Sequence, residues 1–149
     1  MKLTAISNDT WYASSPIQAP NYKTPQIVTM TMETEYKGDF EGVSVASYAM
    51  AAYNPHKTEG EEGCAGGHGD WTFAGIATFA GTVQGKKGTF ATRVTGQVRH
   101  GWSEATNTIV EGTGTDELAG ISGSGCFKVQ VPKESRIKDL EVQWEVEFK

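Results

Sequence analysis

The sequence predicts an all-β domain, and three observations support this fold class. Hydrophobic and polar residues alternate along most of the chain, which is typical of strands with one buried and one solvent-facing side. Glycine occurs 18 times in 149 residues without a repeating period, which favours turns and bulges between strands. Hairpin signals, such as Gly38-Asp39 and residues 84–88, separate neighbouring alternating segments. The length suits one domain with its own core.

The alternating segments are expected to form seven or eight strands. The clearest is 26–37, where Val28, Met30, Met32 and Tyr36 share one parity and threonine, glutamate and lysine occupy the other. The other expected strands are 40–53, 70–79, 89–98, 102–112, 118–131 and 140–148.

The last of these segments is also compatible with a helix. Ile137, Leu140 and Trp144 are spaced three and four residues apart, as on one face of a helix. Five strict alternations of β-branched, aromatic and other apolar residues with polar ones nevertheless favour a strand over 140–148.

Two segments lack a clear pattern. Residues 1–25 contain three of the five prolines and are interpreted as an N-terminal extension with a short strand near 4–12. The predicted barrel domain therefore spans 26–149. Residues 54–70 are rich in glycine and acidic residues, and a loop of this length in a small domain indicates a functional or disordered segment.

The apolar faces of the strands must be buried against each other, either in a two-sheet sandwich or in a closed barrel. We prefer the barrel because closure removes exposed strand edges, and regularly spaced glycines supply the bends that a small barrel requires.

Charge and composition exclude several classes of protein. The net charge is −5 and the pI is near 5.2, which argues against non-specific nucleic-acid binding. No apolar run approaches the ~18 residues of a membrane span, and the first residues lack an apolar signal core. Cys64 and Cys126 form no disulfide framework. We therefore expect a cytoplasmic protein without a membrane or nucleic-acid partner.

Three glycine-containing motifs carry a resemblance to a known family. Residues 37–42 (KGDFEG), 79–90 (FAGTVQGKKGTF) and 112–123 (GTGTDELAGISG) resemble, in order, signatures of the domain of unknown function 3224 family. That family is similar to the allene oxide cyclase barrel, and the resemblance covers residues 26–148. It implies a single antiparallel, eight-stranded, up-and-down barrel of the calycin-like type with a central cavity. Glu111 and Asp116 depart from the pattern, which has proline and glycine there, and the segments 1–25 and 54–70 are additional.

The lumen of such a barrel is the candidate ligand site, since ligand pockets have apolar and aromatic walls with few polar groups. Either parity of 40–53 could face inward, and side chains could also fill the lumen completely. The predicted substrate-binding residues are Met30, Met32, Met50, Trp71, Phe73, Phe90, Trp102 and Trp144.

Glu104 is the predicted catalytic acid or base. It shares its parity with Trp102, which is taken as buried, and desolvation would raise its pKa towards neutrality. Tyr36 and Tyr48 are predicted to polarise a substrate carbonyl or to stabilise a developing oxyanion.

No cofactor or metal is expected. His56, Cys64 and His68 lie in the segment 54–70, but their spacing matches no structural zinc pattern.

These observations predict a cofactor-independent cyclase or isomerase that shapes an apolar, polyene-like substrate in the lumen. The alternative is a non-catalytic barrel that binds or carries a small hydrophobic molecule. A third interpretation is a barrel with a filled lumen that acts through its surface in a homo-oligomer.

Overall fold

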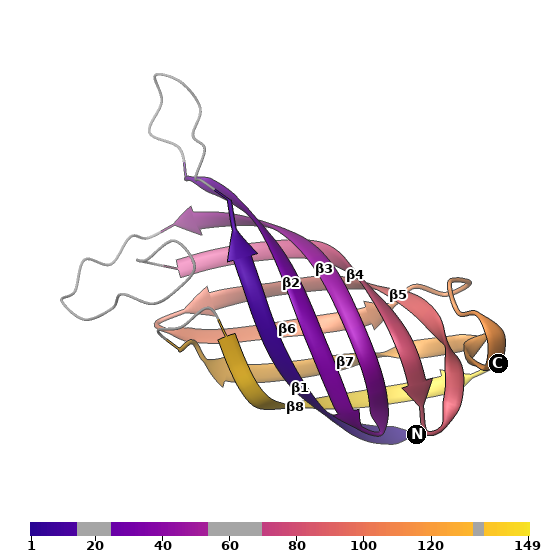
Figure 1. Cartoon of the computed structure of the whole chain (residues 1–149). Coiled ribbons are helices and arrows are strands. Elements are labelled where there is room, and N and C mark those ends of the chain that lie inside the picture. Colours follow the sequence, from indigo (N-terminus) through magenta and orange to yellow (C-terminus); the bar gives the residue numbers. More distant parts are fainter. Residues whose placement is uncertain (15–24, 54–69, 133–135) are drawn as a thin grey trace.

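The computed structural model describes residues 1–14, 25–53, 70–132 and 136–149, and these form one closed barrel (Figure 1). Each strand pairs antiparallel with the next along the chain, and the last strand pairs with the first. The prediction of an eight-stranded antiparallel barrel is confirmed. Its elements are β1 (Lys2–Ala13), β2 (Ile27–Gly38), β3 (Phe40–Tyr53), β4 (Asp70–Val83), β5 (Lys86–Arg99), β6 (Trp102–Ile109), the 3-10 turn η1 (Asp116–Leu118), β7 (Ile121–Gln130) and β8 (Arg136–Phe148).

The first strand corrects the predicted domain boundary. β1 has 12 residues and pairs with both β2 and β8, so the barrel begins at residue 2 and includes residues 2–13 of the predicted extension. The alternation along β1 is hard to recognise because three of its inward residues, Ala5, Ser7 and Asp9, are small or polar. Residues 15–24 of the predicted extension and 54–69 of the predicted loop lie outside the described residues.

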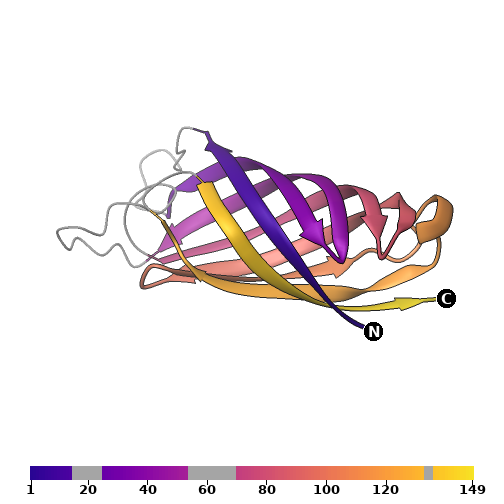
Figure 2. The ribbon, with the colours of Figure 1, turned by 60° about the horizontal axis from the view of Figure 1, so that its bottom comes forward.

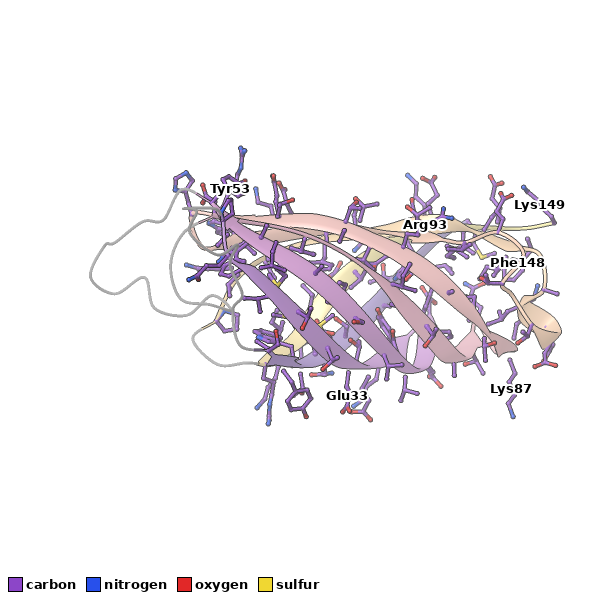
Figure 3. The ribbon with its side chains drawn as sticks, turned by 90° about the horizontal axis from the view of Figure 1, so that it is seen from above. Glu33, Tyr53, Lys87, Arg93, Phe148 and Lys149 are labelled. Carbon is purple, nitrogen blue, oxygen red and sulfur yellow. The ribbon has the colours of Figure 1, made fainter. Side chains whose placement is uncertain are left out.

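The two ends of the barrel differ. Both termini lie at the end where η1 is found, and we call this the closed end (Figure 2). The Leu118 side chain of η1 is fully buried in a cluster that includes Phe40, Phe90 and Ile121. Gly88 permits this approach, because a Cβ at that position would lie 2.2 Å from the Thr115 carbonyl oxygen. We call the opposite end, where β3 stops at Tyr53, the mouth (Figure 3).

The structure also decides which side of each strand faces the lumen. In β3, Phe40, Tyr48 and Met50 are buried, whereas Val43 and Val45 are more than half exposed. The choice between the two parities of 40–53 is thereby settled. On the outer surface, the side chains of Glu33, Lys87 and Arg93 point away from the ribbon (Figure 3).

A β-bulge in β8 explains the ambiguous spacing around Ile137. Ser7 pairs with Leu140 and Asp9 pairs with Ile137, so β1 advances by two residues (7 to 9) where β8 advances by three (140 to 137). Asp139 takes a left-handed φ of 53° there, and its N–H donates to Asn8 Oδ1 at 3.2 Å. The extra residue allows both Leu140 and Ile137 to face inward within a strand. The predicted strand over 140–148 is confirmed, and its helix-like spacing results from the bulge.

Candidate functional site: two adjoining chambers in the lumen

The lumen contains two chambers that share the side chains of Asp9, Met32, Tyr48 and Phe127. The belt chamber lies towards the closed end and has a cavity volume of about 30 Å³. The mouth chamber has a cavity volume of about 90 Å³. The belt chamber is named for its buried polar side chains, which come from five strands: Ser7, Asp9, Thr34, Ser44, Thr92 and Asn107. The mouth chamber is mostly apolar: Trp11, Met30, Met50, Trp71, Phe73, Val94, Val98, Ser103, Val131 and Ile137 complete its wall.

Asp9 lies where the two chambers meet, and only 5% of it is exposed. Its Oδ1 accepts a hydrogen bond from Thr34 Oγ1 at 2.7 Å, and its Oδ2 accepts a longer one from Ser7 Oγ at 3.4 Å. Burial raises the pKa of the Asp9 carboxyl, and the two hydroxyl donors oppose this shift to a smaller extent. Because its pKa is raised, this carboxyl takes up a proton at a higher pH than an ordinary aspartate does, which favours a role as a general acid or base.

Tyr36 and Tyr48 line the belt chamber beside Asp9. Burial raises the pKa of both phenols above the ordinary value, and the negative charge of Asp9 adds to this effect for each. Both hydroxyls therefore remain protonated at neutral pH and can donate a hydrogen bond to an oxygen in the chamber. The structure thus brings the two predicted tyrosines together in the lumen, next to a carboxyl that sequence reasoning did not select.

Most of the predicted substrate-binding residues line these chambers. Met30, Met50, Trp71 and Phe73 line the mouth chamber, while Met32 borders both chambers. Phe90 and Trp144 line the belt chamber.

Glu104 and Trp102 lie outside the lumen, which corrects their predicted placement. The inward residues of β6 are Ser103, Ala105 and Asn107, and Trp102 is 46% exposed. Glu104 is half-buried on the outer surface, where its Oε1 accepts a hydrogen bond from Gln97 Nε2 at 2.6 Å. The prediction for β6 is wrong because it buries Trp102, whereas the Trp102 ring lies on the surface with the Lys128 ammonium 5.7 Å from the ring centre.

Asp9 could have been found from the sequence by one signal. One parity of the segment 3–11 consists of Leu3, Ala5, Ser7, Asp9 and Trp11. The bulky apolar residues at the two ends of this series, Leu3 and Trp11, are buried, so Ser7 and Asp9 between them must also face the lumen. A carboxylate on the inward parity of a strand is the exception that indicates a functional group.

The model of the family described as "Protein of unknown function (DUF3224)" matches residues 9–138. The chain belongs to the DUF3224 family. Its structure is similar to that of a protein with unknown function from this family from Shewanella oneidensis MR-1, with a TM-score of 0.73 and 15% sequence identity. The similarity covers 100% of this chain and 98% of the other, and it shows a shared fold. No curated protein matches the chain. The resemblance inferred from the three glycine motifs is confirmed.

The described residues of the DUF3224 barrel contain neither a grouped set of metal ligands nor a helix that could span a membrane. Within the part of the chain that the structure describes, no three histidine, cysteine, aspartate or glutamate side chains are grouped to hold a metal ion. His56, Cys64 and His68 lie outside that part, so the prediction of a metal-free site stays a prediction. Among the described residues, no helix has the length and hydropathy needed to cross a membrane.

Glu104→Gln is expected to leave ligand affinity and turnover of this DUF3224 barrel within about two-fold of the parent, because surface substitutions away from a site have small effects. The glutamine retains the oxygen that accepts from Gln97 Nε2. Titration with a lumen ligand and an activity assay check this. A ten-fold loss in either measurement would return Glu104 to the list of functional residues.

Asp9→Asn is expected to stabilise the barrel by about 0.5–2 kcal/mol at pH 8, as removal of a strained functional group often does. In the unfolded chain the Asp9 carboxyl has a pKa of about 3.9 and loses its proton above that pH. In the folded protein the pKa is raised, so the carboxyl keeps its proton to a higher pH. Raising the pH through this window therefore lowers the stability of the parent but not of the variant.

Urea unfolding of the two proteins at pH 3.5 and pH 8 measures this difference. The stability advantage of the variant should be larger at pH 8. An advantage that is equal at both pH values would mean that burial does not raise the pKa of Asp9.

Proposed function

We propose that this DUF3224 barrel is a cofactor-independent isomerase or cyclase that binds a small, apolar, polyene-like molecule in its lumen. One observation carries the proposal: the buried Asp9 carboxyl lies beside two protonated tyrosines, at the junction of a polar and an apolar chamber. Lone buried carboxyls with a raised pKa inside a cavity are typical of proton-transfer sites.

Each chamber has a separate role in such a reaction. The mouth chamber supplies apolar surface and adaptable thioethers from Met30 and Met50, which can hold a flexible substrate in a reactive shape. Asp9 removes or delivers the proton, and the hydroxyls of Tyr36 and Tyr48 stabilise the charge that develops.

The second candidate function is a carrier that binds a hydrophobic molecule without transforming it. The apolar wall of the mouth chamber favours this function as much as it favours the enzyme. The two proposals differ in what they require of Asp9, since a carrier has no need of a buried carboxyl with a raised pKa.

Native mass spectrometry after incubation with a metabolite extract tests both proposals. For an enzyme, an isomer absent from the untreated extract should accumulate and should be released when the protein is denatured. Release of a molecule already present in the extract, with no new isomer, would replace the enzyme by the carrier. If nothing is retained and nothing changes, both proposals fail and the lumen acts only as a core.

The proposed partner is therefore a small hydrophobic molecule, and the acidic net charge supports this over a nucleic acid. Cytoplasmic location and assembly into a homo-oligomer remain part of the proposal.

A further inference from the structure

Two tryptophans that line the chambers have hydrogen-bond donors without a partner. Trp144 in the belt chamber is 4% exposed and Trp71 in the mouth chamber is 1% exposed. The indole Nε1 atoms of both side chains are buried and have no hydrogen-bond partner. Among the described residues, every other buried side-chain nitrogen or oxygen atom has one. Such orphaned donors are rare in folded proteins and require an explanation.

The Trp144 ring is held in place by its packing. It stacks on Phe40, with ring centres 4.7 Å apart and planes inclined by 22°. It also covers Gly125, where an added Cβ would lie 2.4 Å from the Cδ2 atom of the indole. The packed ring fixes the position of its N–H group, which costs free energy for as long as it has no acceptor.

Trp144 shares its chamber with Asp9 and Tyr36. The protonated Tyr36 phenol and the Trp144 indole are donors, and the Asp9 carboxylate is a proton acceptor. This set complements a carbonyl group with an acidic C–H bond beside it, because the oxygen accepts the hydrogen bonds while the carboxylate accepts the proton.

We propose that the substrate is an apolar carbonyl compound whose oxygen accepts a hydrogen bond from Trp144 Nε1–H, with its hydrocarbon remainder in the mouth chamber. This inference rests on the proposed function, and it adds the substrate class and a further residue that binds the reacting group.

The corresponding reaction is a 1,3-proton shift, and it is balanced. The substrate of this shift has a carbon–carbon double bond between its β- and γ-carbons. The Asp9 carboxylate takes the proton from the α-carbon next to the carbonyl, and the electron pair of the broken C–H bond is delocalised between the carbonyl oxygen and the γ-carbon. The enolate oxygen is held by the N–H and O–H donors. Asp9, now a carboxylic acid, returns the same proton to the γ-carbon, so the double bond moves and no other reactant is consumed.

Other head groups fit this chamber less well. A carboxylate ligand would place a second negative charge beside Asp9. An ammonium ligand would pair with Asp9 but offers no lone pair, so the Trp144 N–H would remain unsatisfied.

The test compares two probes of matched shape, 2-octanone and 2-methyl-1-octene, in which a C=O group replaces a C=CH₂ group. Their dissociation constants are measured for the parent and for Trp144→Phe, which keeps the ring stack on Phe40. The preference for the ketone over the alkene should fall by about five-fold in the variant, the effect of one lost hydrogen bond. The ratio cancels the difference in hydration between the probes.

A second readout is measured on the parent protein. The indole ¹⁵N–¹H resonance of Trp144, assigned by substituting the other three tryptophans, should move downfield with 2-octanone and not with 2-methyl-1-octene. An unchanged preference in the variant, an unmoved resonance in the ketone complex, or a parent that binds neither probe would overturn the inference. If the metabolite extract still yields an Asp9-dependent isomer in that case, the proposed function stands and only the substrate class is wrong.

Discussion

Asp9→Asn is expected to lower the rate of isomer formation by about 10²–10⁴-fold, the usual contribution of a positioned acid or base. The amide is nearly the same size as the carboxyl, and its oxygen can still accept the hydrogen bond from Thr34 Oγ1. The variant therefore keeps the shape of both chambers and should bind the substrate with an affinity close to that of the parent. What it loses is the ability to take up a proton at pH 7.

Asp139→Asn is the matched control, because it removes an exposed carboxyl from the bulge opposite Asp9. Asparagine tolerates the left-handed φ of 53° at this position, so the bulge should be preserved. The isomer formed from the metabolite extract is quantified by mass spectrometry for both variants. A rate for Asp9→Asn within three-fold of the parent would remove Asp9 from the mechanism, and equal losses in both variants would indicate a structural effect.

Leu118→Ala is expected to destabilise the barrel by about 3 kcal/mol, within the range measured for leucine truncation in well-packed cores. Its side chain is fully buried at the closed end, where Phe40, Phe90 and Ile121 belong to the same cluster. The surrounding strands are tied by backbone pairing on both sides and can close only part of the cavity that the truncation leaves.

Urea unfolding measures this effect as a lower midpoint with an unchanged slope. Glu117→Ala, an exposed position in the same turn, should change the stability by less than about 0.5 kcal/mol. Leu118 contributes to neither chamber, so 2-octanone should bind Leu118→Ala with unchanged affinity under native conditions. A loss below 1 kcal/mol for Leu118→Ala would show that the cluster at the closed end is loosely packed.

The lumen wall could be predicted from the sequence wherever apolar residues alternate with polar ones. In β2 the parity of Val28 and Met30 correctly placed Tyr36 in the lumen, because a half-buried strand exposes one side of its pleat. The same rule failed in β6, where a large aromatic residue lies on the outside and the inward residues are serine, alanine and asparagine. Hydrophobicity alone cannot assign a face when the polar residues are the buried ones.

Most of the strands and most of the apolar wall follow from the amino-acid sequence, since both depend on local alternation and turn chemistry. Only the tertiary structure decided that residues 2–13 close the barrel, because this requires β1 to pair with β8 across nearly the whole chain. That closure places Asp9 beside Tyr36 and Tyr48, whereas Glu104 stays on the outer surface. The site depends on contacts between residues far apart in sequence, and local sequence patterns do not predict such contacts.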